Sequence, residues 1–103
     1  LSADSVQKMI TNQIGDAAIS YAIHGKKFGY GFGIHTADSE RNGSAVGTYS
    51  WAGLFYSYFW VDPQKKLIAV LMPQVFPAGE VNLWAEFQQA VNQAIDKTSI
   101  PVK

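Results

Sequence analysis

The most hydrophobic part of the chain lies in its middle, as three apolar segments separated by two turn signals. These segments are Ala45–Trp51, Phe55–Asp62 and Leu67–Gln74. Ala52-Gly53-Leu54 predicts the first turn, because Gly53 can take the positive φ that tight reversals often need. The second turn is predicted at 62–66, where Pro63 fixes φ and has no N–H to donate. The pattern therefore predicts three consecutive antiparallel strands.

The second and third segments are apolar on both faces, unlike a strand with one side in water. In the second, one face carries Tyr56, Tyr58 and Trp60, and the other carries Phe55, Phe59 and Val61. The third begins with six consecutive apolar residues, 67–72. Both patterns are typical of strands in the middle of a sheet that is covered on both sides.

The segments on either side of these strands show helical spacing. Leu1–Asn12 offers Ser2 as an N-cap and an apolar stripe of Val6, Met9 and Ile10. Asn82–Asp96 repeats Trp84, Phe87 and Val91 on one face, and Gln88 and Asn92 belong to its polar positions. We predict one helix near each end of the chain.

A fourth strand is predicted at Phe28–His35, where aromatic or aliphatic residues alternate with three glycines. A bare glycine face marks a place where another backbone or a ligand approaches closely. The sequence does not decide whether Ala17–Ile23 is a short strand or a loop that packs inward. Ser99–Lys103 is expected to be a tail.

The predicted fold class is therefore α+β, with an antiparallel sheet of about four strands and N- and C-terminal helices in one domain, residues 1–103. Two helices can cover one face of such a sheet, but not both. This mismatch is the central expectation from the sequence: something that belongs beside the sheet is absent.

Composition excludes several classes of function. The formal net charge is zero, which argues against nucleic acid and anionic membrane surfaces as partners. No cysteine is present, and no run reaches the roughly 18 apolar residues of a membrane span. A neutral chain with apolar strand faces is expected to self-associate. Because the chain starts at Leu1 and not at Met, we interpret it as processed, excised or truncated.

The segment Gly47-Thr48-Tyr49-Ser50-Trp51-Ala52-Gly53 resembles the third active-site box of the serine β-lactamase and penicillin-binding-protein superfamily. The similarity is greatest to the class C-like and family VIII carboxylesterase branch, with Ala52 in place of a glycine. Three further segments resemble the helix, the strand and the hairpin around that box, in that order: LSADSVQKMITNQIGD, YGFGI and YFWVDPQKKLIAVLMPQ. The resemblance covers nearly the whole chain, but only the C-terminal third or so of a family member.

The resemblance implies that Tyr49, Trp51, Ala52 and Gly53 line a substrate cleft and that the Leu54 N–H is an oxyanion-hole donor. The nucleophile would lie in a Ser-x-x-Lys box of a preceding part, which is the expected partner of this chain. The parent reaction would be acyl transfer from a serine ester to water, on a β-lactam or small ester, with no metal or other cofactor. A β-lactamase parent implies a periplasmic or secreted location, and an esterase parent leaves the cytoplasm open.

The chain offers little chemistry of its own. Ser5-Val6-Gln7-Lys8 spells Ser-x-x-Lys, but serine and lysine are common enough here for a chance match, and we interpret it as a solvated helical turn. His24 and His35 have no carboxylate at metal or triad spacing, so no metal site is expected. Asp38 and Glu40 are expected to be solvated in a polar loop.

Two alternatives to the hydrolase segment stay open. The first is a non-catalytic pairing module, which would form a homo-oligomer or strand-exchanged pair through the open strand Leu67–Gln74. The second is a small ligand-binding domain that uses the aromatic residues Tyr49, Trp51, Phe55 and Tyr56.

Overall fold

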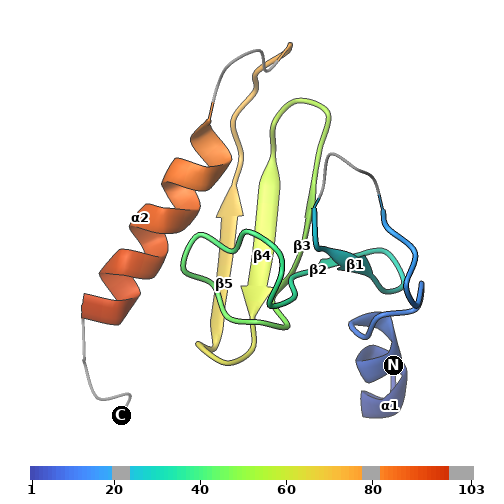
Figure 1. Ribbon diagram of the computed structural model, residues 1–103. Helices are drawn as coiled ribbons and strands as arrows, with labels where there is room; N and C mark the ends of the chain where they lie inside the picture. Colours follow the sequence, from blue (N-terminus) through green and yellow to red (C-terminus); the bar gives the residue numbers. More distant parts are fainter. Residues whose placement is uncertain (20–23, 78–81, 98–103) are drawn as a thin grey trace.

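Two helices flank a five-stranded antiparallel sheet, which confirms the predicted α+β class. The computed structural model describes residues 1–19, 24–77 and 82–97. In chain order the elements are α1 (Ala3–Met9), β1 (Lys27–Phe28), β2 (Gly33–Ile34), β3 (Tyr49–Ala52), β4 (Tyr58–Asp62), β5 (Leu67–Leu71) and α2 (Leu83–Lys97). The strands follow one another across the sheet in the same order (Figure 1). The predictions for Ala17–Ile23 and Ser99–Lys103 lie partly and wholly outside the described residues.

The predicted single strand at Phe28–His35 is wrong, because the chain reverses within it and forms β1 and β2. The Gly29 N–H donates to the Phe32 carbonyl at 2.9 Å, and Gly31 has a φ of +102°. A side chain on Gly29 would overlap the Met9 carbonyl, and the next N–H, of Tyr30, donates to that same oxygen at 2.9 Å. The expected close approach of another backbone therefore occurs at Gly29, and the reversal adds a fifth strand.

The predicted tight turn at Ala52-Gly53-Leu54 is also wrong: β3 and β4 are joined by the longer loop 53–57. The residue with positive φ is Tyr56, at +77°, and not Gly53. Tyr56 holds this conformation while its ring stacks on Trp84 at 4.3 Å and its carbonyl accepts from Trp84 Nε1 at 2.7 Å. Because Tyr56 makes these contacts with α2, β4 begins at Tyr58 and not at the predicted Phe55.

The second predicted turn agrees with the structure, but two strands are shorter than predicted. The predicted turn 62–66 is confirmed, and Asp62 Oδ1 accepts from the Lys65 N–H at 3.0 Å. β3 starts at Tyr49 and not at Ala45, because Gly47 takes a φ of +91° and the Thr48 N–H donates to the Ala45 carbonyl. β5 ends at Leu71, short of the predicted Gln74.

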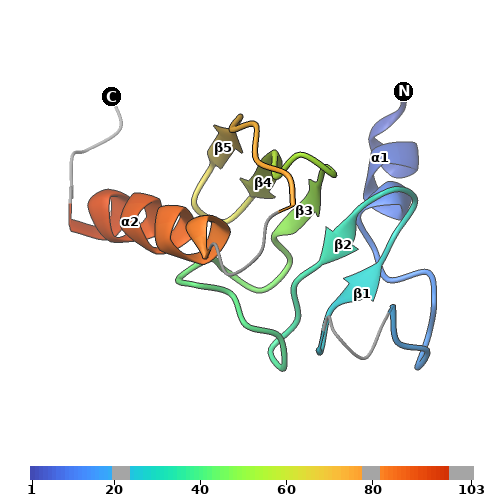
Figure 2. The same ribbon diagram turned by 90° about the horizontal axis from the view of Figure 1, so that it is seen from above.

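The core lies between α2 and one face of the sheet. Tyr58, Trp60 and Ala69 are buried there, and Trp84, Phe87 and Val91 of α2 pack against them. Trp60 is completely buried and meets Phe87 edge-on, with ring centroids 5.6 Å apart. Figure 2 shows α2 along the β4 and β5 side of the molecule, while α1 lies at the β1 and β2 end.

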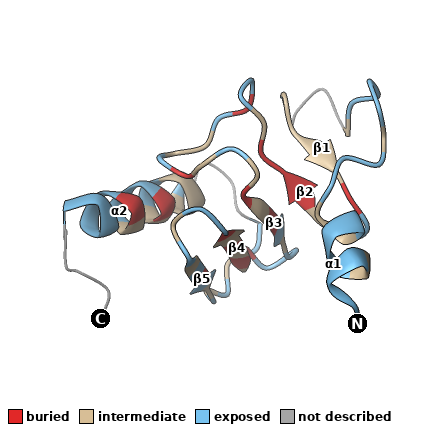
Figure 3. Ribbon diagram, turned by 90° about the horizontal axis from the view of Figure 1, so that it is seen from below, coloured by how far each residue is buried: buried red, intermediate tan, exposed pale blue. Residues whose placement is uncertain are grey.

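The opposite face of β5 has no cover in the described part of the chain. Ile68, Val70 and Met72 are exposed there, Val70 by 57% and Met72 by 83%. Further along this face, Phe32 of the β1–β2 hairpin packs on Tyr49 and Phe59. α1 contributes little to covering this face, because it has no buried residue, and Figure 3 shows it exposed along most of its length.

Candidate functional site

The box residues 47–53 lie just before β3, in β3 itself and at the start of the loop that follows it. Tyr49 packs on Phe32, and Trp51 meets Phe28 edge-on at 5.3 Å while 43% of its surface is exposed. Leu54 is 73% exposed, and its N–H has no hydrogen-bond acceptor among the described residues. A free, exposed N–H is the kind of group that an oxyanion hole requires.

An apolar hollow of about 330 Å³ lies at this end of the sheet. It is lined by Trp51, Ala52, Gly53, Ser57, Tyr58, Phe59, Val70, Leu71 and Met72. Three of the four residues expected to bind substrate therefore meet here, whereas Tyr49 and Leu54 do not belong to its wall. The hollow opens on the side of the sheet where Val70 and Met72 are exposed.

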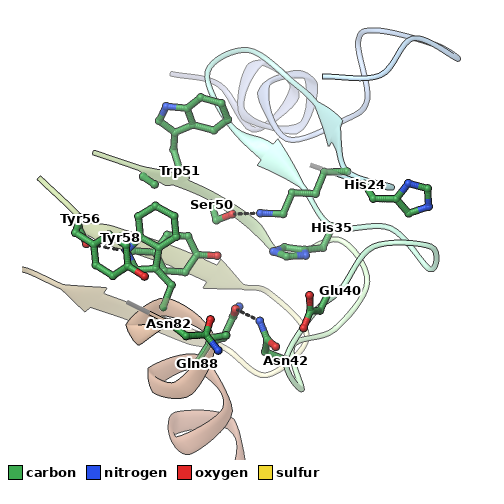
Figure 4. Close-up of a pocket in the computed structure, with 14 residues that line it drawn as sticks. His24, His35, Glu40, Asn42, Ser50, Trp51, Tyr56, Tyr58, Asn82 and Gln88 are labelled. Carbon is green, nitrogen blue, oxygen red and sulfur yellow. Dashed lines mark hydrogen bonds between the residues drawn. The ribbon is translucent and has the colours of Figure 1, made fainter. Parts of the chain in front are cut away.

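A second, more polar cleft of about 460 Å³ lies between the sheet and the first half of α2 (Figure 4). Its lining residues include Lys26, His35, Ser50, Tyr58, Trp84 and Gln88, with His24, Glu40 and Asn42 from the loops. Trp51 and Ala52 line this cleft as well, so β3 separates two hollows. Sequence reasoning missed the cleft, because its residues come from five separate parts of the chain.

Lys26 places a positive charge in this cleft. Its Nζ donates to Ser50 Oγ at 3.3 Å, and burial lowers the pKa of Lys26. Within the described ranges, no carboxylate lies within salt-bridge distance of this amine. Lys26 is therefore a partly buried cation without an acidic partner in that part of the chain.

His35 lines the same cleft and is only 2% exposed. Its Nδ1 contacts Ser39 Oγ at 3.3 Å, whereas Nε2 has no partner in the part of the chain described. Burial lowers the pKa of His35 to about 4, helped by the charges of Lys26 and Arg41 and opposed by Asp62 and the Glu40 carbonyl. The imidazole is therefore neutral at neutral pH.

The lowered pKa of His35 predicts an acid-sensitive fold. The folded pKa, about 4, lies below the unfolded value of 6.5, so the unfolded chain binds more protons between these values. The free energy of unfolding has its full value above pH 6.5 and should fall by up to about 3 kcal/mol as the pH is lowered to 4. Urea titrations across this range should show the loss in the native sequence and in a His24→Gln control. An equal loss in His35→Gln would contradict the assignment.

A polar network beside the cleft buries two residues that the sequence places among the polar positions of α2, while Trp84 and Phe87 pack on the sheet as predicted. Gln88 and Asn92, expected on its polar face, are buried, and the side-chain nitrogen of each donates to Ser44 Oγ at 3.0 Å. Asn42 Nδ2 in turn donates to Gln88 Oε1 at 3.2 Å. Burial raises the pKa of Tyr58 nearby, while hydrogen bonds from Ser50 and Gln88 oppose this shift. The network fixes the 42–44 loop against α2.

The other residues considered from the sequence have ordinary partners. Ser5 is within 3.0 Å of Ser2 Oγ, and Lys8 forms an exposed ion pair with Asp4 at 3.1 Å. Asp38 is exposed in the loop after β2, as predicted. No group of three potential metal ligands occurs in the described residues, and none of the helices there is long and apolar enough to cross a bilayer.

The aromatic residues suggested as a ligand-binding cluster lie in different surroundings. Trp51 and Tyr56 line the polar cleft, whereas Tyr49 packs on Phe32 and Phe55 packs on Phe76 at 5.4 Å. These four side chains therefore do not converge on one site.

Comparison of the chain with models of known protein families and with curated proteins finds no match.

Proposed function

We propose that this chain is the C-terminal segment of a β-lactamase-like serine hydrolase, to which it contributes the third active-site box and the oxyanion-hole strand. Its parent would hydrolyse a β-lactam or a small ester through a serine ester intermediate. The chain alone would not be catalytic, since Ser5 and Lys8 are engaged elsewhere and lie on the exposed helix α1.

The observation that carries this proposal is the open wall formed by the box. Trp51, Ala52 and Gly53 line a hollow that opens on the uncovered side of the sheet, and the Leu54 N–H is free among the described residues. A segment bearing a serine nucleophile and its base has room to approach this wall. The uncovered Val70 and Met72 would then be buried against that segment.

The experiment uses the polypeptide extended upstream of Leu1, in which we expect a Ser-x-x-Lys box. This longer protein should hydrolyse nitrocefin or p-nitrophenyl esters, whereas the 103-residue chain should not. Leu54→Pro removes the N–H and should lower kcat by about 100- to 1000-fold. Leu54→Ala is the matched control, because it keeps the N–H and trims an exposed side chain.

Two outcomes would refute the proposal. One is hydrolysis by the 103-residue chain that Ser5→Ala abolishes. The other is an extended, folded protein without any Ser-x-x-Lys box.

A second candidate function is a pairing module, favoured by the position of β5. This strand lies at the edge of the sheet and pairs only with β4 among the described strands. An edge strand with exposed apolar side chains is a template for another strand. The same surface would serve either a missing segment of the parent or a second copy of this chain.

A further inference from the structure

The polar cleft contains a cation whose charge the described residues do not neutralise. Lys26 Nζ donates to Ser50 Oγ, and an ammonium group has two further N–H donors. The other charges that act on His35 are those of Arg41 and of Asp62, which is fully buried and accepts from Ala45 and Lys65. The carboxylate of Glu40 also lines the cleft, but Glu40 is exposed and forms no ion pair with Lys26. The buried part of the cleft around Lys26 therefore favours an anion.

His35 provides an independent indication that a ligand belongs here. A buried polar atom without a partner is costly, and His35 Nε2 is such an atom in the described structure. The Nδ1 contact with Ser39 holds the other side of the ring, so Nε2 is the nitrogen that is left for a ligand. The Ser39 hydroxyl donates to the Thr36 carbonyl, so an acceptor placed between Lys26 and His35 would engage both residues once Nε2 carries a proton.

The remaining walls fit a flat, apolar body. Trp84 is stacked on Tyr56 and Tyr58, and these rings form an apolar wall together with Ala52 and Ala85. The amide of Gln88 is already engaged by Asn42 and Ser44, so it presents no free group to a ligand. A volume of about 460 Å³ is in the usual range for small-molecule sites.

We propose that this cleft binds a small organic monoanion, an aromatic carboxylate, with its carboxylate at Lys26 and Ser50 and its ring against the apolar wall that includes Ala52 and Ala85. Bound carboxylate offsets the charge of Lys26, so His35 can take up a proton and donate from Nε2. Binding should accordingly strengthen as the pH falls below neutrality. This inference does not depend on the proposed hydrolase function, because it concerns the side of the sheet that faces α2.

The test is a titration of the full chain with benzoate, followed by calorimetry and by tryptophan fluorescence, since Trp51 and Trp84 line the cleft. We expect saturable binding of benzoate and binding of benzamide that is about 10- to 100-fold weaker, because the uncharged amide lacks the charge-assisted contact. Lys26→Met should weaken benzoate binding by a similar factor. Lys27→Met is the matched control, since Lys27 Nζ donates to the Ala17 carbonyl outside the cleft.

Benzamide binding as tight as benzoate, or no saturable binding of benzoate, would overturn the proposal on the native sequence alone. Equal affinity of folded Lys26→Met and Lys27→Met would also overturn it. Calorimetry in buffers of different ionisation enthalpy measures proton uptake on binding. We expect proton uptake on benzoate binding near pH 6, and we expect it to disappear in His35→Gln. Proton uptake that persists in this variant would contradict the role of His35.

Discussion

Replacing Trp60 with alanine is expected to lower the free energy of unfolding by about 3–5 kcal/mol, a large part of the roughly 5–15 kcal/mol of a typical domain. Trp60 has no exposed surface and contacts Tyr58 and Phe87 in the only core between the sheet and α2 that the described residues form. The truncation leaves a cavity that α2 cannot fill, because the buried Gln88 and Asn92 hold the helix to the 42–44 loop. Urea unfolding followed by circular dichroism measures the change.

Trp51→Ala is the matched control for this prediction. The same number of atoms is removed, but Trp51 is 43% exposed and its main ring contact is Phe28. The expected loss is therefore smaller, about 1–2 kcal/mol. Equal losses in the two variants would show that the core does not lie on the α2 side of the sheet.

The second large effect concerns self-association through β5. Val70 lies on the uncovered face of this edge strand, next to Ile68 and Met72. Burial of a side chain of this size contributes about 1.5–3 kcal/mol, so three such residues can stabilise a contact between two copies. Val70→Lys places a charge in that contact and should weaken association by about 100-fold or more.

The control for Val70→Lys is Gln89→Lys, which adds the same charge on the exposed side of α2. This variant should associate like the native sequence. If Gln89→Lys dispersed the protein as well as Val70→Lys did, net charge and not the β5 face would govern association. Sedimentation velocity at matched concentrations compares the three proteins.

The elements that the sequence predicts well are those whose pattern is local. The turn 62–66 and the helix Leu83–Lys97 follow from proline chemistry and from the 3.6-residue repeat of apolar side chains. The break in Phe28–His35 could not be predicted in the same way. It depends on the Met9 carbonyl, which meets the Gly29 and Tyr30 backbone from another part of the chain.

The candidate site was harder to predict than the fold. Alternation along β3 indicates that Ser50 and Trp51 point to opposite faces, but not that Lys26 reaches Ser50 across 24 positions of sequence. The burial of Gln88 and Asn92 likewise depends on a loop more than 40 residues away. A polar residue on a helix is read as solvated unless its distant partner is known.

The central claim is that the sheet has an apolar face and an edge strand that the two helices of the described residues do not cover. Sedimentation equilibrium of the purified chain tests this most directly. We predict an average mass above the 11.3 kDa of one chain that rises with concentration and returns to that value in Val70→Lys. A single species of 11.3 kDa at every concentration, with the fold intact, would contradict the account.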